Sequence, residues 1–433
     1  MNKQECAIKY VEDNYLQFNR LRHDIIADKL QVRCAHPIGD GLEAKGERQE
    51  QWREMTKHDI NSIVCHAAQE YDANITSREV MTALQSDLIP DVHPLREYVL
   101  SCGEWTEEQP DWIDWVASQV RVKPLGDEAK GDKARGERLW RACFKKWFVA
   151  MVASWMKDEV VNHQVLVLIG KQGIFKTTWL EHLIPPHLRA YACKLANSND
   201  LNKDERLRIA EFGLISLDEI DSMNNRELNQ LKSVITATDV NERAAYAYTK
   251  ERRVRLASFC ASGNRRDFLT DITGNRRWLP FEVESIQNPF TTILPYERMY
   301  AQAWALAQDP LFSYWFDLEE IEVLEQHNQY FRDESNEEQL LPILFDVPAE
   351  DRGEFMTTAQ ISERLVTYGN IKKPMALSRL GMVLGTAGFR AVTRKAGSGR
   401  ARGWIVYQRD NNEINALRRL LKDDTSQLDT AIY

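Results

Sequence analysis

Short apolar runs separated by segments of helical pattern occupy the middle of this 433-residue chain. Each run has four to eight residues, a length that suits strands buried on both faces of a sheet. The runs are residues 165–169, 214–217, 255–262 and 278–283. Alternation of such runs with helices predicts an α/β fold built on a central parallel sheet.

The segments that precede the first run are expected to be mainly helical. Residues 55–122 and 138–160 place apolar side chains three and four residues apart, as amphipathic helices do. A Gly-rich, charged loop over residues 124–137 separates them. Residues 1–60 mix strand and helix signals, and the pattern there does not decide between the two.

The C-terminal part of the chain differs from the rest in charge. Residues 317–339 are acid-rich and predict a solvated helix and linker, whereas no acidic residue occurs between Glu363 and Asp410. Over that second interval the pattern predicts two helices and a hairpin with a Gly-rich tip, as in a winged helix. Such modules can bind proteins, but the local charge favours nucleic acid. The basic residues expected to contact DNA are Arg394, Lys395, Arg400 and Arg402.

These patterns divide the chain into six expected segments. The fold class that we expect is α/β, with a helical N-terminal region before the core and a winged-helix-like domain after it. The segments are a mixed N-terminal region (1–60), a helical region (61–160), the core (161–310), an acidic helix and linker (311–354), the winged-helix-like domain (355–410) and a tail (411–433).

Charge and cysteine content exclude several classes of protein. The formal net charge is −9, so the chain is not a uniformly basic DNA-coating protein, and any contact with nucleic acid must be local. The seven cysteines are scattered without a C-x-x-C pair, which favours reduced thiols over disulfides or a zinc site. No apolar run approaches the roughly 20 residues that span a bilayer, and the N-terminus is too polar for a secretory signal. We therefore expect a cytoplasmic protein with no membrane partner.

The segment GKQGIFKTT, which follows the first apolar run, has the composition of a loop that binds phosphate. Gly170 and Gly173 let the backbone turn its N–H groups inward, and such a nest is an anion site. Lys176 would then reach the β- and γ-phosphates of a nucleotide, and Thr177 would hold Mg²⁺ through its hydroxyl. Thr178 is the next residue that we expect at this nucleotide site.

One position departs from the usual pattern of such loops, G-x-x-x-x-G-K-[ST]. Phe175 stands where the pattern has glycine. A bulky side chain there is expected to tilt the loop or slow the chemistry, so the pattern predicts nucleotide binding more directly than hydrolysis. The alternative is a strand, a turn and a helix that carry a lysine by coincidence.

Polar residues follow the second and third apolar runs. Asp218 and Glu219 follow the second run; Asp218 can bind Mg²⁺, and Glu219 can polarise an attacking water. Asn264 follows the third run and could hold the same water or touch the γ-phosphate. Each could instead belong to an ordinary solvated loop or turn. Their order along the chain, after Lys176, favours the catalytic interpretation.

Two adjacent arginines, Arg276 and Arg277, precede the fourth run. Phosphoryl transfer builds negative charge, which the planar guanidinium group can stabilise. The alternative is a surface pair bonded to carboxylates. The other motifs favour a role in catalysis.

The segment between the second and third runs mixes basic and aromatic residues. Basic groups can bind phosphates and aromatic rings can stack on bases, which makes the segment a candidate DNA contact. The alternative is a charged surface hairpin. The candidate residues are Arg243, Tyr246, Tyr248, Lys250, Arg252 and Arg253.

Five stretches of the chain resemble the virulence-associated E family, which phages and integrated mobile elements mostly encode. That family is similar to superfamily 3 helicases, a branch of the AAA+ ATPases. The sequence DITGNRRW is the most specific of the matching parts. The stretches are HPLREYV (93–99), LIGKQGIFKTTWL (168–180), LISLDEID (214–221), LKSVITATDVNERAAYAY (231–248) and SGNRRDFLTDITGNRRWLPFEV (262–283).

The resemblance implies an AAA+ P-loop core that uses ATP and Mg²⁺. Lys176 and Thr177 would be the Walker A residues, Asp218 and Glu219 the Walker B residues, and Asn264 the sensor that ends motif C. Phe175 departs from the commoner glycine of the family.

The resemblance also implies self-assembly. Arg276 or Arg277 would act as an arginine finger across a subunit boundary, which requires a head-to-tail neighbour and leads to a ring. The implied assembly is a hexamer around DNA, with a hairpin within residues 239–255 pointing into the central pore.

The expected function is an ATP hydrolase that works as a DNA helicase or translocase in replication of a phage or mobile element. Its DNA would be single-stranded or forked. No primase signature occurs in the first 90 residues, so a priming activity would come from a separate chain. Two alternatives stay open: a DNA-binding initiator or scaffold that uses ATP for assembly, and an ATPase that acts on protein partners.

Overall fold

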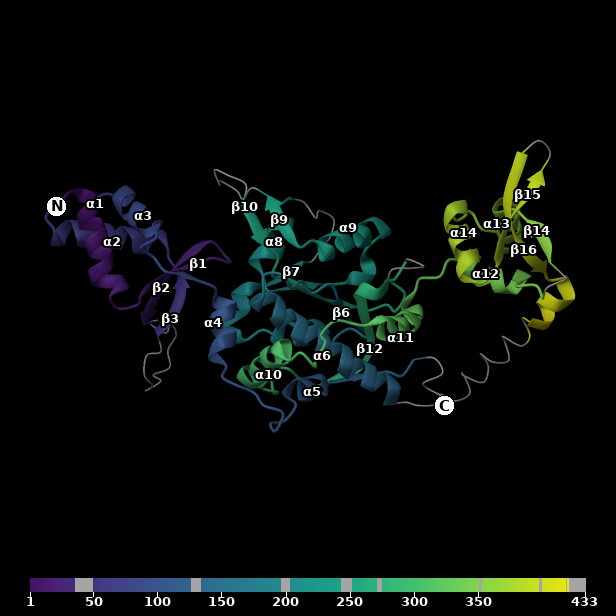
Figure 1. Cartoon of the computed structure of the whole chain (residues 1–433), viewed down its shortest axis with the longest axis horizontal. Coiled ribbons are helices and arrows are strands. Elements are labelled where there is room, and N and C mark those ends of the chain that lie inside the picture. The colour runs from purple at the N-terminus through teal and green to yellow at the C-terminus, as the bar shows by residue number, and fades with distance from the viewer. Residues whose placement is uncertain are drawn as a thin grey trace. The chain divides into compact units, whose positions relative to one another are not determined.

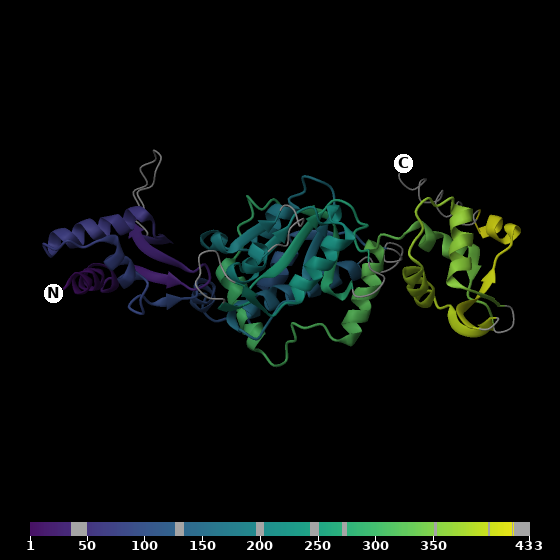
Figure 2. The same cartoon turned by 90° about the horizontal axis from the view of Figure 1, so that it is seen from above.

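The computed structural model describes residues 1–35, 50–125, 134–195, 203–242, 251–270, 275–349, 353–396, 399–417 and 419. The chain is a mixed α/β protein that divides into two compact units (Figures 1 and 2). Unit 1 comprises Met1–Asn264 and Trp278–Glu320, and unit 2 comprises Arg265–Arg277 and Ile321–Tyr433. Within the described residues, no helix has both the length and the apolar character needed to cross a membrane.

The N-terminal part of unit 1 contains a small sheet in the order β3-β2-β1-β4. Its strands are β1 (Leu21–Asp24), β2 (Lys29–Ala35), β3 (Glu50–Glu54) and β4 (Asp91–Val92). The helical elements that accompany it are α1 (Lys3–Val11), the π-helical turn η1 (Glu12–Leu16), α2 (Lys57–Glu70) and α3 (Ser77–Leu84). Residues 1–60, where the sequence pattern did not decide between strand and helix, thus contain both, whereas the expectation of a helical region after them is wrong at β4. These strands are short and partly polar, so they leave no clear apolar run in the sequence.

Six strands form the central sheet of unit 1, in the order β5-β12-β6-β11-β8-β7. They are β5 (Val120–Val122), β6 (Val165–Ile169), β7 (Ala192–Leu195), β8 (Leu214–Leu217), β11 (Ser258–Gly263) and β12 (Trp278–Ile286). Neighbouring strands are parallel except for β5, which pairs antiparallel with β12. The four apolar runs are strands β6, β8, β11 and β12, which confirms the predicted parallel sheet.

Strand β11 begins three residues later than the sequence pattern predicts. Leu256 and Ala257 both donate their backbone N–H groups to the carbonyl oxygen of Ile209, at 2.9 and 3.0 Å, and so do not join the ladder. Leu256 and Ala257, which precede the strand, are therefore hydrogen-bonded to helix α8 (Lys203–Glu211).

The long helix α6 (Ala134–Met156) packs on one face of this sheet (Figure 1). Trp147 Nε1 donates to the carbonyl oxygen of Phe259 at 3.1 Å, and Trp155 Nε1 donates to that of Gly213 at the same distance. These bonds satisfy indole N–H groups that burial removes from water. The predicted helix before the first run is confirmed, although it ends at Met156. The other helices of unit 1 are α4 (Pro94–Ser101), α5 (Trp112–Ala117), α7 (Lys176–His182), α9 (Asn225–Thr236) and α10 (Tyr296–Gln308).

A two-stranded hairpin, β9 (Asp239–Glu242) and β10 (Glu251–Val254), stands apart from the central sheet. Its base is fixed by Arg255, which is fully buried and has no carboxylate partner among the described residues. The guanidinium group donates to the carbonyl oxygens of Ile235 and Ala237 at the end of α9, and to that of Asn162 at 2.9 Å. Arg255 thus joins the hairpin, α9 and the segment before β6.

Unit 2 is a small α/β module with its own apolar core. Strand β16 pairs antiparallel with the other three strands, β13, β14 and β15. The two helices and the hairpin expected between residues 355 and 410 are present, whereas β14 was not predicted. The elements are α11 (Leu318–Asn328), which begins in unit 1, α12 (Asn336–Leu344), β13 (Phe345–Asp346), β14 (Glu354–Met356), α13 (Thr358–Gly369), α14 (Leu377–Thr386), β15 (Arg390–Ala396) and β16 (Gly399–Gln408).

The acidic segment is not uniformly solvated, contrary to the expectation. Glu337 and Glu338 are only 4 % and 9 % exposed. Glu337 Oε1 accepts a 2.6 Å hydrogen bond from the backbone N–H of Met375, and Glu338 pairs with Arg332 and Arg379. Two of these partners lie more than 35 residues further along the chain, so the local charge pattern could not reveal them.

Candidate functional site

The carboxyl ends of three parallel strands bring the predicted site residues of unit 1 together. Gly263 of β11 is in register with Ile169 of β6, and Ala261 is in register with Leu217 of β8. The residues that follow β6, β8 and β11 therefore meet at one edge of the sheet, where ligands bind in open α/β sheets.

The loop between β6 and α7 turns sharply at its glycines. A Cβ atom at Gly170 would lie 2.9 Å from the carbonyl oxygen of Val283, so only glycine fits that close approach. Gly173 has φ +84°, in the left-handed region that glycine adopts without steric cost. Gly173 thus has the positive φ expected of a phosphate loop, whereas the backbone N–H of Gly170 donates to the carbonyl oxygen of Gly263 at 3.1 Å.

Phe175 occupies the N-cap position of α7 with φ +67° and ψ +16°. For a residue with a side chain this left-handed conformation costs about 1–2 kcal/mol. The ring packs edge-on against Phe290, with ring centroids 6.3 Å apart. The structure therefore places a strained aromatic residue at the one position where the sequence departs from the usual pattern.

Lys176 is 7 % exposed, and its ammonium group is fully occupied by oxygen atoms. Nζ donates to the carbonyl oxygens of Gly170 at 2.8 Å and Lys171 at 2.7 Å, and lies 3.3 Å from Asn264 Oδ1. Burial lowers the pKa of Lys176, while the nearby carboxylates of Asp221 and Asp218 oppose that shift. Lys176 and Asn264, which the sequence analysis placed at one site, are therefore neighbours in the structure.

Asp218 is held by hydroxyl groups from two different elements. Its Oδ1 accepts from Ser262 Oγ at 2.7 Å and from Thr177 Oγ1 at 3.2 Å, and the two hydroxyls lie 2.9 Å apart. Its Oδ2 lies 2.8 Å from Lys194 Nζ. Burial raises the pKa of Asp218, but the hydrogen bonds from Lys194 and Ser262 outweigh burial and leave the pKa below its ordinary value.

Glu219 is exposed and, like Phe175, has a positive φ, +53°. Strained backbone of this kind persists where the surrounding structure imposes it, often at functional sites. Two residues on, Asp221 Oδ1 accepts the backbone N–H of Asn264 at 3.0 Å and so links the ends of β8 and β11. Glu219 itself is exposed and lines the cavity at this edge of the sheet.

These residues surround a cavity of about 320 Å³. Hydroxyl and carboxylate oxygens are the ligands that Mg²⁺ prefers, and it binds through one or two protein groups plus water and phosphate. Thr177 and Asp218 fit that requirement; no cluster of three or more His, Cys, Asp or Glu side chains elsewhere in the described residues could hold a metal. The lining residues are Gln172, Gly173, Phe175, Lys176, Thr177, Thr178, Asp218, Glu219, Ser262, Gly263 and Asn264.

Residues 129–338, which include this cavity, match the family model of the virulence-associated protein E-like domain. The chain therefore contains a virulence-associated protein E-like domain over these residues, a little under half of its length. The resemblance that the sequence motifs indicated is therefore confirmed.

Three solved structures of the NrS-1 C terminal region are similar to the chain at 11–12 % sequence identity. They cover 90–93 % of this chain and 98–99 % of their own, with TM-scores of 0.40–0.43. Similarity at this level does not bear on activity. No curated protein matches the chain.

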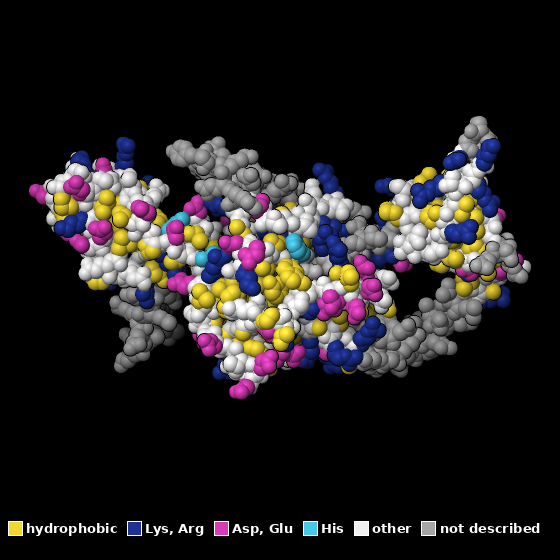
Figure 3. Space-filling view, in the orientation of Figure 1, with side chains coloured by type: hydrophobic (Ala, Val, Ile, Leu, Met, Phe, Trp, Pro, Cys, Tyr) yellow, Lys and Arg dark blue, Asp and Glu magenta, His cyan; other side chains and the backbone are white. Residues whose placement is uncertain are grey.

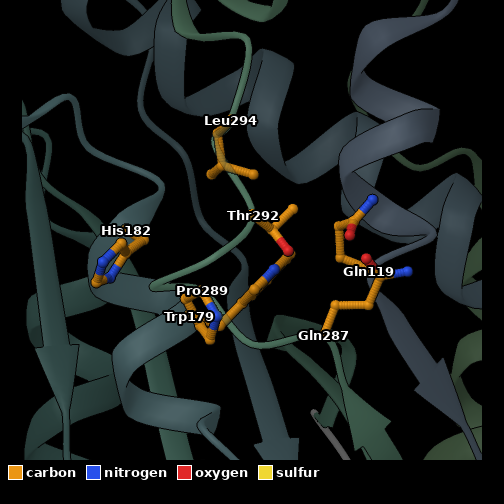
Figure 4. A pocket seen from close by; sticks show the side chains of 7 residues that line it. All are labelled: Gln119, Trp179, His182, Gln287, Pro289, Thr292 and Leu294. Carbon is orange, nitrogen blue, oxygen red and sulfur yellow. The ribbon is translucent and has the colours of Figure 1, made fainter.

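A second, much smaller cavity of about 10 Å³ lies beside α7 in unit 1 (Figure 4). Trp179 and His182 of α7 line it together with Gln119 and Thr292. That volume holds about one water molecule. Gln119 Oε1 and Trp179 Nε1 lack a protein partner there, so a single bridging water suits the space and a nucleotide base does not.

Of the predicted residues of the virulence-associated protein E-like domain that the structure describes, five do not line the 320 Å³ cavity: Gly170, Arg252, Arg253, Arg276 and Arg277. Arg276 and Arg277 belong to the short helical turn η5 (Asn275–Arg277) of unit 2; Arg276 is exposed and Arg277 half-buried. Arg253 of β10 forms ion pairs with Asp28 at 3.2 Å and Glu211 at 3.5 Å. Arg252 lies in the same strand, whereas Arg243, Tyr246, Tyr248 and Lys250 lie outside the described residues.

The basic residues predicted in unit 2 share one hairpin. Arg394 and Lys395 of β15 are in register with Ala401 and Arg400 of β16. These three basic side chains and the fourth, Arg402, are exposed. Figure 3 shows Lys and Arg side chains gathered over this part of unit 2. Arg394 lies over the ring of Phe355, 5.3 Å from its centre, which holds one guanidinium group against the surface.

The sequence analysis missed three residues at or beside the 320 Å³ cavity: Ser262, Asp221 and Lys194. Ser262 is the last polar residue of the third apolar run, so its position one residue before Gly263 was a usable signal. Asp221 is the third acidic residue of LISLDEID. Lys194 lies on the edge strand β7, where no motif marks it.

Proposed function

We propose that the chain is an ATP hydrolase that acts as a DNA helicase or translocase in replication of a phage or mobile element. The observation that carries the proposal is the convergence of five side chains on one cavity of unit 1. They are Lys176, Thr177, Asp218, Glu219 and Asn264.

The contacts of these side chains suggest their roles. Lys176 would leave the carbonyl oxygens of the loop and turn to the phosphates, which are stronger acceptors. Thr177 and Asp218 would hold Mg²⁺, which, when bound, neutralises charge on the β- and γ-phosphates. Glu219, exposed at the mouth of the site, would orient the attacking water and accept its proton, and Asn264 would hold that water or the γ-phosphate.

The proposal includes assembly into a ring, with a hexamer as the expected size. In this arrangement Arg276 or Arg277 supplies the arginine finger for the site of a neighbouring subunit. The exposure of Arg276, and the absence of an ion pair between either arginine and another described residue, support availability for such a contact.

DNA would be contacted in two places. The β9–β10 hairpin would reach a single strand in the ring, and the basic hairpin of unit 2 would bind phosphates of the same or a neighbouring duplex. A priming activity would come from a separate protein.

Two variants of the nucleotide site test the proposal. Lys176→Ala should weaken ATP binding by at least about a hundredfold, because it removes the buried cation. Glu219→Gln should retain binding but lose about 10²–10⁴-fold in hydrolysis, because the amide cannot accept the proton. Equal hydrolysis by wild type and both variants would overturn the proposal.

The strained conformation of Phe175 favours one alternative, a DNA-binding initiator or scaffold that uses ATP only to assemble. In that case wild type would bind ATP without turnover, and Glu219→Gln would make no difference. An ATPase that acts on protein partners is the remaining alternative, and it predicts that Lys250→Glu with Arg252→Glu leaves both ATP turnover and DNA binding unchanged.

A further inference from the structure

Lys194 lies beside the nucleotide site but belongs to none of the motifs that define it. It projects from β7, the edge strand next to β8, and its side chain is 45 % exposed. Its ammonium nitrogen lies 2.8 Å from Asp218 Oδ2. The carboxylate of Asp218, one of the two candidate metal ligands, is therefore already paired with the ammonium group of Lys194.

Both oxygens of Asp218 are engaged by the protein. Oδ1 accepts from the hydroxyls of Ser262 and Thr177, and Oδ2 is paired with Lys194. Thr177 Oγ1, the other candidate metal ligand, is also bonded to Ser262 Oγ at 2.9 Å. A divalent cation that binds here must compete with these contacts, and Lys194 is the only full positive charge among them.

Two further carboxylates lie near enough to act on Lys194. The hydrogen bond that Lys194 donates to Asp218 raises the pKa of Lys194, and Glu181 of α7 and Glu219 add to that effect by their negative charge. An ammonium group displaced from Asp218 therefore has other anions close by. Displacement would exchange one partially solvated ion pair for another, which keeps its energetic cost low.

We propose that Lys194 is an internal counter-ion that occupies Asp218 until Mg²⁺ and nucleotide displace it, and so sets the concentration of Mg²⁺ that the site requires. The inference rests on the proposed function in that Asp218 must be the residue that meets the metal. Lys194 is then a positioning residue: it acts through Asp218 and has no role in the proton transfer itself.

The test compares the Mg²⁺ dependence of binding in four proteins: wild type, Lys194→Met, Lys194→Arg and Lys123→Met. Lys123 is the matched control, because it forms an ion pair with Glu282 at 2.6 Å, is similarly exposed at 41 %, and does not line the cavity. ADP binding is measured by calorimetry over a series of Mg²⁺ concentrations. A second series follows Mg²⁺ alone through the melting temperature.

In Lys194→Met the half-saturating Mg²⁺ concentration should fall about two- to fivefold, the change expected for removal of a partly exposed ion pair. Lys194→Arg keeps the charge and should behave like wild type, as should Lys123→Met. An unchanged or higher half-saturating concentration in Lys194→Met overturns the inference. If none of the four proteins binds ADP, the proposed function fails. The series with Mg²⁺ alone then tests the inference about Lys194, and equal melting-temperature shifts in wild type and Lys194→Met overturn it.

Discussion

The charged side chains of the 320 Å³ cavity in unit 1 and of the β15–β16 hairpin in unit 2 differ in burial and in contacts. Lys176 is buried, and its ammonium group is surrounded by oxygen atoms of the protein. On the hairpin, Arg394, Lys395, Arg400 and Arg402 are exposed and form no ion pair with another described residue. Buried groups change their pKa values, whereas exposed charges attract counter-ions. Unit 1 should therefore respond to pH, and binding by unit 2 should respond to salt.

The largest effect that we expect concerns pH and His93. Burial lowers the pKa of His93 to about 4, and the charge of Arg96 adds to the shift. The unfolded state, with an ordinary pKa of 6.5, binds the proton first, so stability is complete above pH 6.5 and falls as the pH drops from 6.5 toward 4. The loss should reach about 3 kcal/mol, measured as the free energy of unfolding in urea.

The matched variant is His93→Asn, because His93 Nδ1 caps α4 by accepting the backbone N–H of Arg96 and asparagine can do the same. This variant should lose much of the slope between pH 6.5 and 4. An identical slope in both proteins would show that another group causes the pH dependence.

A salt-dependent effect is expected from the hairpin of unit 2. Replacing Arg394, Lys395, Arg400 and Arg402 by glutamine should weaken DNA binding at least about tenfold at 0.1 M salt, and should lower the slope of log K against log salt by about 3. ADP binding should not change. Fluorescence anisotropy with a labelled DNA over a salt series measures both quantities.

The control for this prediction removes four exposed bases from the N-terminal part of unit 1: Lys3, Lys9, Lys57 and Arg78. Net charge changes equally in the two variants. If both lose the same affinity and slope, the contact with DNA is not local to the hairpin.

The smallest effect is expected at Phe175. At φ +67°, Phe175→Gly should be more stable than Phe175→Ala by about 1 kcal/mol, because alanine keeps the left-handed strain. This order is the reverse of that in a helix interior, where alanine is favoured. Urea midpoints of the two variants provide the comparison, and alanine being the more stable of the two would contradict the left-handed conformation.

The convergence of Lys176, Asp218 and Asn264 on one cavity could be predicted because parallel strands bring their carboxyl ends to one edge of the sheet. Lys176, Asp218 and Asn264 each follow an apolar run, and the runs are adjacent in the sheet. Lys194 could not be predicted, because its strand has no long apolar run and its partner lies 24 residues away. The burial of Glu338 likewise depends on Arg379, which is distant in sequence.

The N-terminal sheet also could not be predicted, because it depends on strands that are far apart in the sequence. Its strands β1 and β4 have four and two residues and pair across an intervening 66 residues of sequence. Local patterns carry no information on such a pairing. The turn between β6 and α7 could be predicted, because Gly170 and Gly173 are a local signal for a turn.

In the proposed function, DNA binding is coupled to ATP hydrolysis in the cavity of unit 1. The most direct test is the rate of ATP hydrolysis by the full chain with and without single-stranded DNA, in wild type and in Lys176→Ala. We expect the rate to rise with DNA in wild type and to be absent from the variant under both conditions. A wild-type rate that DNA leaves unchanged, or that Lys176→Ala retains, would contradict it.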